Sequence, residues 1–119
     1  MISNVLVENR QLFNCWYEVD LGMSAVVSGV ITQGGLYYYR VTRYKVSYKK
    51  LPSLDFEDIL DRKGGFGKVF EGNIEDSRFP ITNMFEECIV ATIVRVVPVA
   101  YKHGVALRLE LLGCYNEVE

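Results

Sequence analysis

The most constraining feature of this sequence is the alternation of apolar and polar side chains with a period of two residues. In "VALRLELL" (Val105–Leu112), the first valine and three leucines fall on one face of the chain, and Arg108 and Glu110 fall on the other. Such alternation is typical of a β-strand that is buried on one side. The segment "CIVATIVRVV" (Cys88–Val97) is dense in β-branched residues and predicts a strand that is buried on both sides.

Further strands are expected where β-branched and aromatic residues run between turn residues. They are expected at residues 16–21, 25–32, 41–48, 56–60 and 68–70. Turn residues separate them at positions 22, 34–35, 52–53, 64–65, 72–73 and 103–104. No stretch has a persuasive period of 3.6 residues, and the length of 119 residues fits one domain. The sequence therefore predicts a single all-β domain over residues 1–119, built as a sandwich of two antiparallel sheets.

Composition narrows the possible partners. Half of the residues are hydrophobic and the formal net charge is -2, so nucleic acid is not an expected partner. No apolar run approaches the roughly 20 residues of a membrane-spanning helix. Residues 1–10 lack a basic start and a continuous apolar segment, so no secretory signal peptide is visible in this chain.

The stretch "KGGFGKVFEG" (Lys63–Gly72) has the glycine pattern of the loop that covers ATP phosphates in protein kinases. The chain is too short for a two-lobed kinase, and neither a His-Arg-Asp catalytic loop nor an Asp-Phe-Gly metal ligand follows this stretch. We therefore predict a tight hairpin in which Gly64 and Gly65 form the turn before a strand that begins at Lys68.

Residues that could support catalysis or bind metal are sparse. Cys15, Cys88 and Cys114 are too widely spaced for the Cys-x-x-Cys pairs of zinc sites, and their odd number leaves at least one thiol without an intrachain partner. His103 is the single histidine, so neither a metal cluster nor a Ser-His-Asp triad has support. No paired carboxylates are visible. We expect no enzyme activity, no cofactor and no metal site.

Six motifs follow one another along the chain. They are "WYEVDLG" (16–22), "VSGVITQGG" (27–35), "VTRYKVSY" (41–48), "VFEGN" (69–73), "IVRVVP" (93–98) and "GVALRLELLGC" (104–114). In order and spacing they resemble the discoidin family, also called coagulation factor V/VIII type C (F5/8 type C) domains, over about residues 15–114. The resemblance implies an antiparallel jelly-roll β-sandwich of the galactose-binding-domain type, whose loops at one end bind ligands.

The resemblance also implies a non-catalytic recognition or adhesion module that is extracellular or at the cell surface. Its expected partners are an anionic phospholipid, a glycan or a protein ligand. The loop "QGGLYYYR" (Gln33–Arg40) stands at the position of an apolar spike that dips into a bilayer or lines a ligand groove. The expected residues of this ligand- or membrane-binding loop are Leu36, Tyr37, Tyr38 and Arg40. The alternative is that the tyrosines merely begin the next strand and pack locally.

By the same resemblance, the turn before the last strand borders a polar groove beneath the spike. Its expected members are Gln33, His103 and Arg108. For Arg108, as for Arg95, a structural ion pair is the preferred interpretation, because each guanidinium sits in an otherwise apolar strand. Trp16 is expected to fill the space between the two sheets.

Charge is uneven in the middle of the chain. Five basic residues fall within residues 40–50, and four acidic residues follow at once within residues 55–61. We expect these charges to neutralise one another across a hairpin as a solvated, self-paired surface.

The sequence departs from the family at its start. A full domain has a longer N-terminal part, with a cysteine that pairs with the terminal one, whereas fifteen residues precede Trp16 here. The resemblance thus implies truncation at the N-terminus and exposed sheet edges, covered by Met1–Asn14, by a homo-oligomer or by a partner chain. Cys114 would then either pair with Cys15 or stay reduced. A second hypothesis follows, in which the chain is a structural interaction subunit of a larger assembly that has lost the ligand-binding end.

Overall fold

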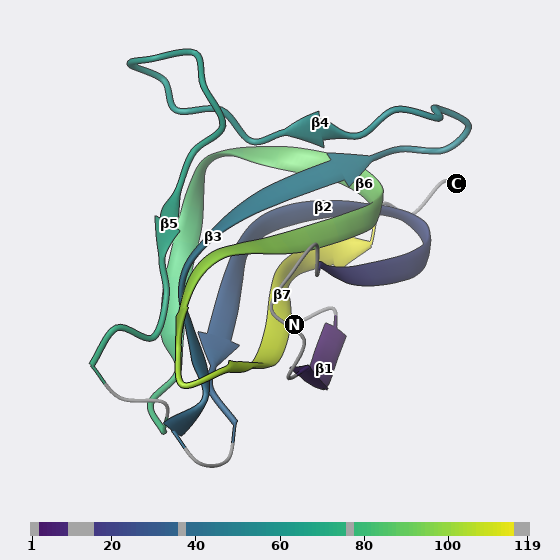
Figure 1. Ribbon diagram of the computed structural model, residues 1–119. Helices are drawn as coiled ribbons and strands as arrows, with labels where there is room; N and C mark the ends of the chain where they lie inside the picture. The colour runs from purple at the N-terminus through teal and green to yellow at the C-terminus, as the bar shows by residue number, and fades with distance from the viewer. Residues whose placement is uncertain (1–2, 10–15, 36–37, 76–77, 116–119) are drawn as a thin grey trace.

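The computed structural model is built from β-strands joined by turns and loops (Figure 1). It describes residues 3–9, 16–35, 38–75 and 78–115. The strands are β1 (Ser3–Asn9), β2 (Tyr17–Gln33), β3 (Arg40–Lys49), β4 (Glu57–Asp58), β5 (Phe70–Glu71), β6 (Ile81–Lys102) and β7 (Val105–Tyr115). No α-helix occurs within these ranges, so the predicted all-β class is confirmed.

Hydrogen bonds join the strands in the order β1-β7-β2-β6-β3-β4, with β5 also paired to β3. The two longest strands bend and take part in both layers of the sandwich (Figure 1). The start of β2 pairs with residues 93–96 of β6, whereas its end pairs with residues 81–84 of β6 and with β7. The later half of β6 pairs with β3. This shared use of β2 and β6 folds one antiparallel sheet over itself, as the predicted jelly-roll sandwich requires.

A bend in β2 replaces the turn that was predicted at Gly22. The backbone of Gly22 has a φ of 76°, and its amide donates a hydrogen bond of 2.8 Å to Oδ1 of Asp20. The pairing of β2 with β6 shifts register between Asp20 and Ala25. Glycine tolerates positive φ at low cost, so the chain bends here without ending the strand.

The core contains the apolar faces that the alternation predicted. On β7, the inward face is at most 1% exposed; it consists of Val105, Leu107, Leu109 and Leu111. On β3, the ring of Tyr44 is fully buried and stacks on Phe70 with 5.5 Å between ring centroids. Fully burying one such side chain contributes about 1.5–3 kcal/mol, so the core provides most of the stabilisation.

The prediction that Trp16 fills the core is wrong. Trp16 is 49% exposed, and its ring lies against the guanidinium of Arg95 at 4.9 Å. Side chains alternate along β2, and Tyr17 takes the inward position, which leaves Trp16 outside. Arg95 forms the predicted ion pair, with 2.7 Å between its Nε and Oε1 of Glu18.

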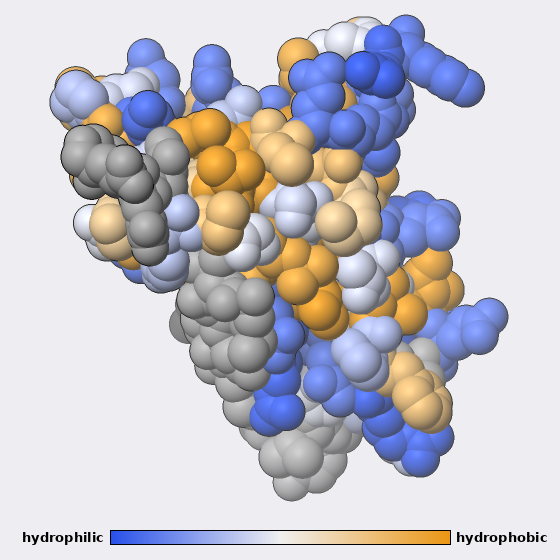
Figure 2. Space-filling model, turned by 180° about the vertical axis from the view of Figure 1, so that it is seen from behind, coloured by the Kyte–Doolittle hydropathy of each residue, from blue (hydrophilic) through white to orange (hydrophobic). Residues whose placement is uncertain are grey.

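The outer edge of β7 is covered by the N-terminal strand. β1 pairs antiparallel with β7 from Ser3 opposite Leu111 to Asn9 opposite Val105. Of the three covers considered from the sequence, β1, which lies within the segment Met1–Asn14, thus supplies one for this edge. On the side of the molecule seen from behind, apolar residues form a band between polar ends (Figure 2).

The glycine-rich stretch forms the predicted hairpin. Leu60 and Gly67 form an antiparallel bridge, and the amide of Asp61 donates a 2.7 Å hydrogen bond to the carbonyl of Phe66. Gly65 has a φ of 70°, as the turn requires. Lys68 then leads the chain into β5.

Two cysteines can be placed. Cys88 and Cys114 are exposed free thiols, and Cys15 lies outside the described residues. Nothing in the described ranges is a helix with the length and apolar character needed to cross a membrane.

Candidate functional site

Three connections meet at one end of the sandwich, which we call the loop end. They are the β2–β3 loop (34–39), the β5–β6 loop (72–80) and the β6–β7 turn at His103 and Gly104. All three lie at the bottom of Figure 1. Each is tied to a neighbouring element by side-chain hydrogen bonds or by close packing, and these contacts determine which side chains are presented to solvent.

The β2–β3 loop presents Tyr38. Its side chain is 67% exposed and its φ is 62°, a left-handed backbone conformation that is rare for a bulky residue. The loop is closed by a 3.0 Å hydrogen bond from the amide of Gly35 to the carbonyl of Tyr39. The predicted residues Leu36 and Tyr37 lie outside the described residues.

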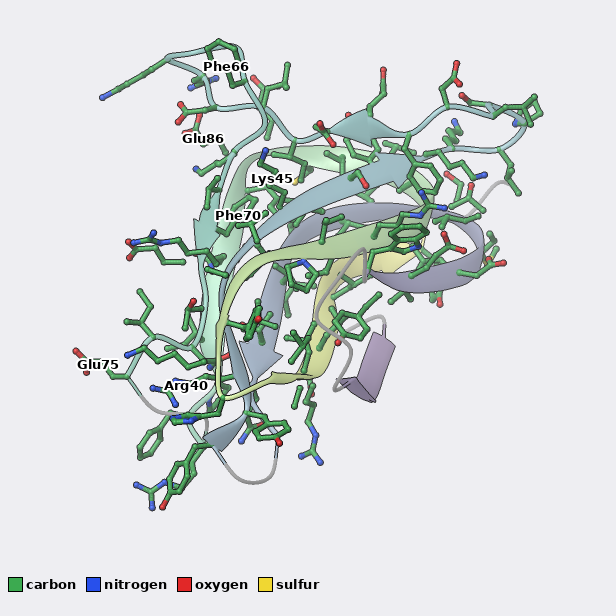
Figure 3. All side chains as sticks on the ribbon, in the orientation of Figure 1. Arg40, Lys45, Phe66, Phe70, Glu75 and Glu86 are labelled. Carbon is green, nitrogen blue, oxygen red and sulfur yellow. The ribbon has the colours of Figure 1, made fainter. Side chains whose placement is uncertain are left out.

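Arg40 lies beneath Tyr38 at the start of β3 and is only 8% exposed. Its Nε and Nη2 donate to the carbonyl of Ile74 at 3.3 and 3.2 Å, and its Nη1 donates to the carbonyl of Tyr38 at 3.1 Å. Figure 3 shows Arg40 at the lower end of the molecule, among the loops of the loop end. Arg40 was expected among the ligand-binding residues; in the structure its guanidinium joins the β2–β3 loop to the β5–β6 loop.

Asn73 makes the second connection, and sequence reasoning did not single it out. It is fully buried, and its Nδ2 donates to the carbonyls of Thr32 at 3.1 Å and Phe79 at 2.9 Å. A buried amide with two such bonds holds the end of β2 and both ends of the β5–β6 loop together. The signal was present in the motif "VFEGN", where asparagine follows the glycine that comes directly after β5.

The predicted polar groove residues lie on adjacent elements of this end. Gln33 and Arg108 are register partners on β2 and β7. Nε2 of Gln33 donates to the carbonyl of Arg78, whereas Arg108 is exposed. The predicted ion pair of Arg108 is absent among the described residues. His103 is exposed at the β6–β7 turn with a φ of 66°.

The β6–β7 turn packs closely on the β2–β3 loop. A Cβ at Gly104 would lie 2.8 Å from the ring of Tyr39. The φ of Gly104 is 153°, so a side chain at this position would both clash with Tyr39 and strain the backbone. The short distance shows that the ring of Tyr39 lies directly on this turn. The turn and the loop that carries Tyr38 therefore form one packed unit.

Apolar side chains are exposed along the β5–β6 loop. Phe79 is 60% exposed and Ile74 is 38% exposed. Both line a groove of about 830 Å³ that also includes Ile81 and the carboxylates Glu71 and Glu75. The guanidinium of Arg78 lies over the ring of Phe79 at 5.7 Å. This groove thus combines an exposed ring with one guanidinium and two carboxylates.

Within the described residues, no three His, Cys, Asp or Glu side chains gather as a metal site would require. The pKa of Tyr44 is raised to about 12, chiefly by burial, while a hydrogen bond from Asn83 partly offsets the increase. A phenol with a raised pKa is a poor acid–base group at neutral pH.

Comparisons with known proteins agree with the β-sandwich fold. A family model described as F5/8 type C domain matches residues 8–111. Lactadherin of Mus musculus is 40% identical over 100 residues, which cover 83% of this chain and 21% of lactadherin. Retinoschisin of Takifugu rubripes is 35% identical over 103 residues, which cover 86% of this chain and 36% of retinoschisin. The chain therefore spans between about a fifth and about a third of the length of these two relatives.

Among solved structures, recombinant discoidin II of Dictyostelium discoideum superposes with a TM-score of 0.72 at 21% identity. The match covers 86% of this chain and 38% of that chain. At this identity the similarity concerns the fold alone.

Proposed function

Because the chain belongs to the F5/8 type C, or discoidin, domain family, we propose that it is a non-catalytic extracellular recognition module whose loop end binds its ligand. The family consists of binding domains known for attachment to phospholipids, carbohydrates and proteins in extracellular proteins. The proposal concerns which part of this chain makes the contact and with what chemistry.

The observation that carries the proposal is the contrast between Tyr38 and Arg40. Tyr38 is held out in solvent at a backbone conformation that costs free energy, while Arg40 is buried beneath it and bonded to the carbonyls of Tyr38 and Ile74. Strained backbone persists where surrounding structure holds it, and such positions cluster at binding sites. The alternative, in which the tyrosines only begin β3 and pack locally, predicts a buried ring at Tyr38, whereas this side chain is 67% exposed.

The exposed groups favour an anionic phospholipid surface over the other ligand classes. The ring of Tyr38 can enter the interfacial region while its hydroxyl stays hydrated. Phe79 adds a second exposed ring, and Lys102 and His103 are exposed at the adjoining turn. A basic residue near an anionic membrane contributes roughly 1 kcal/mol, which salt screens.

The experiment compares wild-type protein with Tyr38→Asn in sedimentation with phosphatidylserine vesicles, with neutral phosphatidylcholine vesicles as the reference and a glycan array in parallel. Asparagine tolerates the left-handed backbone, so the change removes the ring without adding strain. We expect vesicle affinity to fall about tenfold or more, since burying one such side chain is worth about 1.5–3 kcal/mol. The double variant with Leu36→Ser is expected to lose binding altogether.

Phe66→Asn is the matched control, because Phe66 is 78% exposed but lies at the opposite end of the molecule (Figure 3). Vesicle binding should be unchanged in this variant. Loss of binding in Phe66→Asn with full binding in Tyr38→Asn would contradict the proposal. Wild-type protein that binds neither vesicles nor glycans would favour the second hypothesis, a structural interaction subunit.

A further inference from the structure

A second groove lies at the end of the molecule opposite the loop end. Its walls are the hairpin of residues 59–68, the short strand β4 and residues 86–89 of β6, and its volume is about 660 Å³. We call this region the hairpin end. Figure 3 shows Phe66 and Glu86 there, far from Arg40 and Glu75 at the loop end.

The inner surface of this groove is apolar. Ile59 packs against the core, Phe70 is 2% exposed and Ile89 is 8% exposed, and all three line the groove. Apolar side chains are also exposed on and beside the hairpin. Leu60 is 55% exposed, and Phe66 at the tip of the hairpin is 78% exposed. A side chain entering this groove would find apolar surface to bury against.

The rim of the groove is acidic. Its five carboxylates are those of Glu57, Asp58, Asp61, Glu86 and Glu87, and its two cations are Arg62 and Lys68. Both cations are engaged by the β6 carboxylates. Arg62 lies 3.2 Å from Glu86 and 3.0 Å from Glu87, and Lys68 lies 3.6 Å from Glu86.

The other three carboxylates have no ion pair within the described part of the chain. Asp61 accepts a 3.0 Å hydrogen bond from the amide of Lys63. Glu57 interacts with the hydroxyl of Tyr48, whose pKa is raised by burial and by this carboxylate. The sequence predicted that these acids would be neutralised by the basic residues of β3. The carboxylates face solvent, as that prediction expected, and β4 pairs with β3 through its backbone at Ser47 and Tyr48. The side chains of Lys45 and Asp58 both lie beside Gly67, but the described residues show no ion pair between the two groups of charges.

We propose that the hairpin end docks a cationic peptide segment of a partner protein, in which basic residues alternate with large apolar ones. Charge complementarity selects this occupant, because three unpaired carboxylates border a groove whose own cations are already engaged. The apolar inner surface accepts the side chains between the basic residues. An extended peptide suits the site, since its side chains alternate between the groove and the rim. The site is separate from the loop end, so both could be occupied together.

The probe is a fluorescently labelled six-residue peptide that alternates arginine and leucine, titrated with the full chain and followed by fluorescence anisotropy at low salt. Reference peptides alternate glutamate with leucine and arginine with serine. The arginine–leucine peptide should bind at least about tenfold more tightly than either, since it alone supplies both charge and apolar surface. Equal binding of the glutamate–leucine peptide would overturn the proposal.

Two variants test the site itself. The triple variant Glu57→Gln, Asp58→Asn and Asp61→Asn keeps the hydrogen-bonding atoms but removes the charges, and should weaken binding about tenfold at low salt and little at high salt. Leu60→Ser should weaken it several-fold at either salt concentration. The matched control, Glu71→Gln with Glu75→Gln, removes exposed carboxylates of the groove near the loop end and should leave the affinity unchanged.

Backbone amide chemical shifts locate the contact. Addition of the arginine–leucine peptide should shift amides within residues 57–68 and 86–89 and leave residues 38–40 and 73–75 in place. Shifts confined to the loop end, or a triple variant that binds as tightly as wild type, would show that the peptide does not use this groove. Vesicle binding by the triple variant should match wild type, which keeps this test independent of the one for Tyr38.

Discussion

The two ends of the molecule are stabilised in different ways. At the loop end, Arg40 and Asn73 are buried and donate hydrogen bonds to main-chain carbonyls of neighbouring segments. At the hairpin end, Arg62 pairs with Glu86 and Glu87 through side chains that are 69%, 45% and 78% exposed. A buried donor cannot be replaced readily by water, whereas an exposed ion pair competes with water and salt.

This difference suggests different uses for the two ends. In the proposed function, the buried bonds of the loop end hold Tyr38 in one place before a ligand arrives, and this would lower the ordering cost of binding. The exposed charges of the hairpin end contribute little to stability. In the proposed peptide site, these charges would instead determine which partner approaches and how fast.

The largest effect is expected for Asn73→Ala at the loop end. The change removes both hydrogen bonds of Nδ2 and leaves the carbonyls of Thr32 and Phe79 without this donor. We expect the free energy of unfolding to fall by about 3 kcal/mol, measured by urea denaturation. Asn83→Ala is the control, because Asn83 is half-buried and also donates two bonds, to the hydroxyl of Tyr44 and the carbonyl of Glu71. A loss of about 1 kcal/mol is expected for this control.

The next largest effect is a loss of folding stability at high pH, which should depend more on Tyr44 than on Tyr48, both on β3. The pKa of Tyr44 is about 12 in the folded chain against 10.0 in the absence of burial, so the unfolded chain releases this proton first. The contribution of the protonated Tyr44 to the free energy of unfolding is fully present below pH 10. It is lost as the pH rises toward 12, and the loss amounts to about 2.5 kcal/mol. Urea unfolding between pH 8 and 12 measures this loss, and Tyr44→Phe should remove it. Tyr48→Phe, at the less buried hairpin end, should remove less.

Arg40→Met is expected to cost about 2 kcal/mol in urea denaturation. Methionine keeps most of the buried stem but loses the donors to Ile74 and Tyr38, whose carbonyls are partly reached by water. The same variant should weaken vesicle binding, because the loop that carries Tyr38 is no longer braced. Full vesicle binding by a destabilised Arg40→Met would show that the brace serves stability alone.

The smallest effect is expected for an arginine-to-methionine substitution at the hairpin end. Arg62→Met should lower the free energy of unfolding by about 0.5 kcal/mol or less, since its partners are exposed and can be hydrated. The difference should shrink further in 1 M salt. Equal losses for Arg40→Met and Arg62→Met would remove the distinction between the two ends.

The alternation of side chains predicted the class of fold and most of the strands. The inward face of β7 was identified residue by residue, because a period of two fixes which side chains share a face. The start of β6 was missed by seven residues, since Glu86 and Glu87 lie on its exposed part and break the apolar pattern that marked the strand from Cys88. The bend at Gly22 was taken for a turn, because a glycine with positive φ serves either purpose.

The candidate site could be predicted only in part. The position of the loop at residues 33–40 was available from the resemblance to the discoidin family. The burial of Arg40 was not, because its partner is the carbonyl of Ile74, 34 residues away in the sequence. The role of Asn73 depends in the same way on Thr32, 41 residues away.

By itself, the sequence determined that this chain forms antiparallel strands, that a glycine-rich hairpin lies at residues 64–65, and to which family the chain is similar. These properties follow from local spacing and residue type. Only the tertiary structure decided that Tyr17 rather than Trp16 faces the core, that Arg40 is a brace, and that a groove with an acidic rim opens beside the hairpin. Each of these depends on which distant segment lies opposite a given residue, and a pattern along the chain does not contain that information.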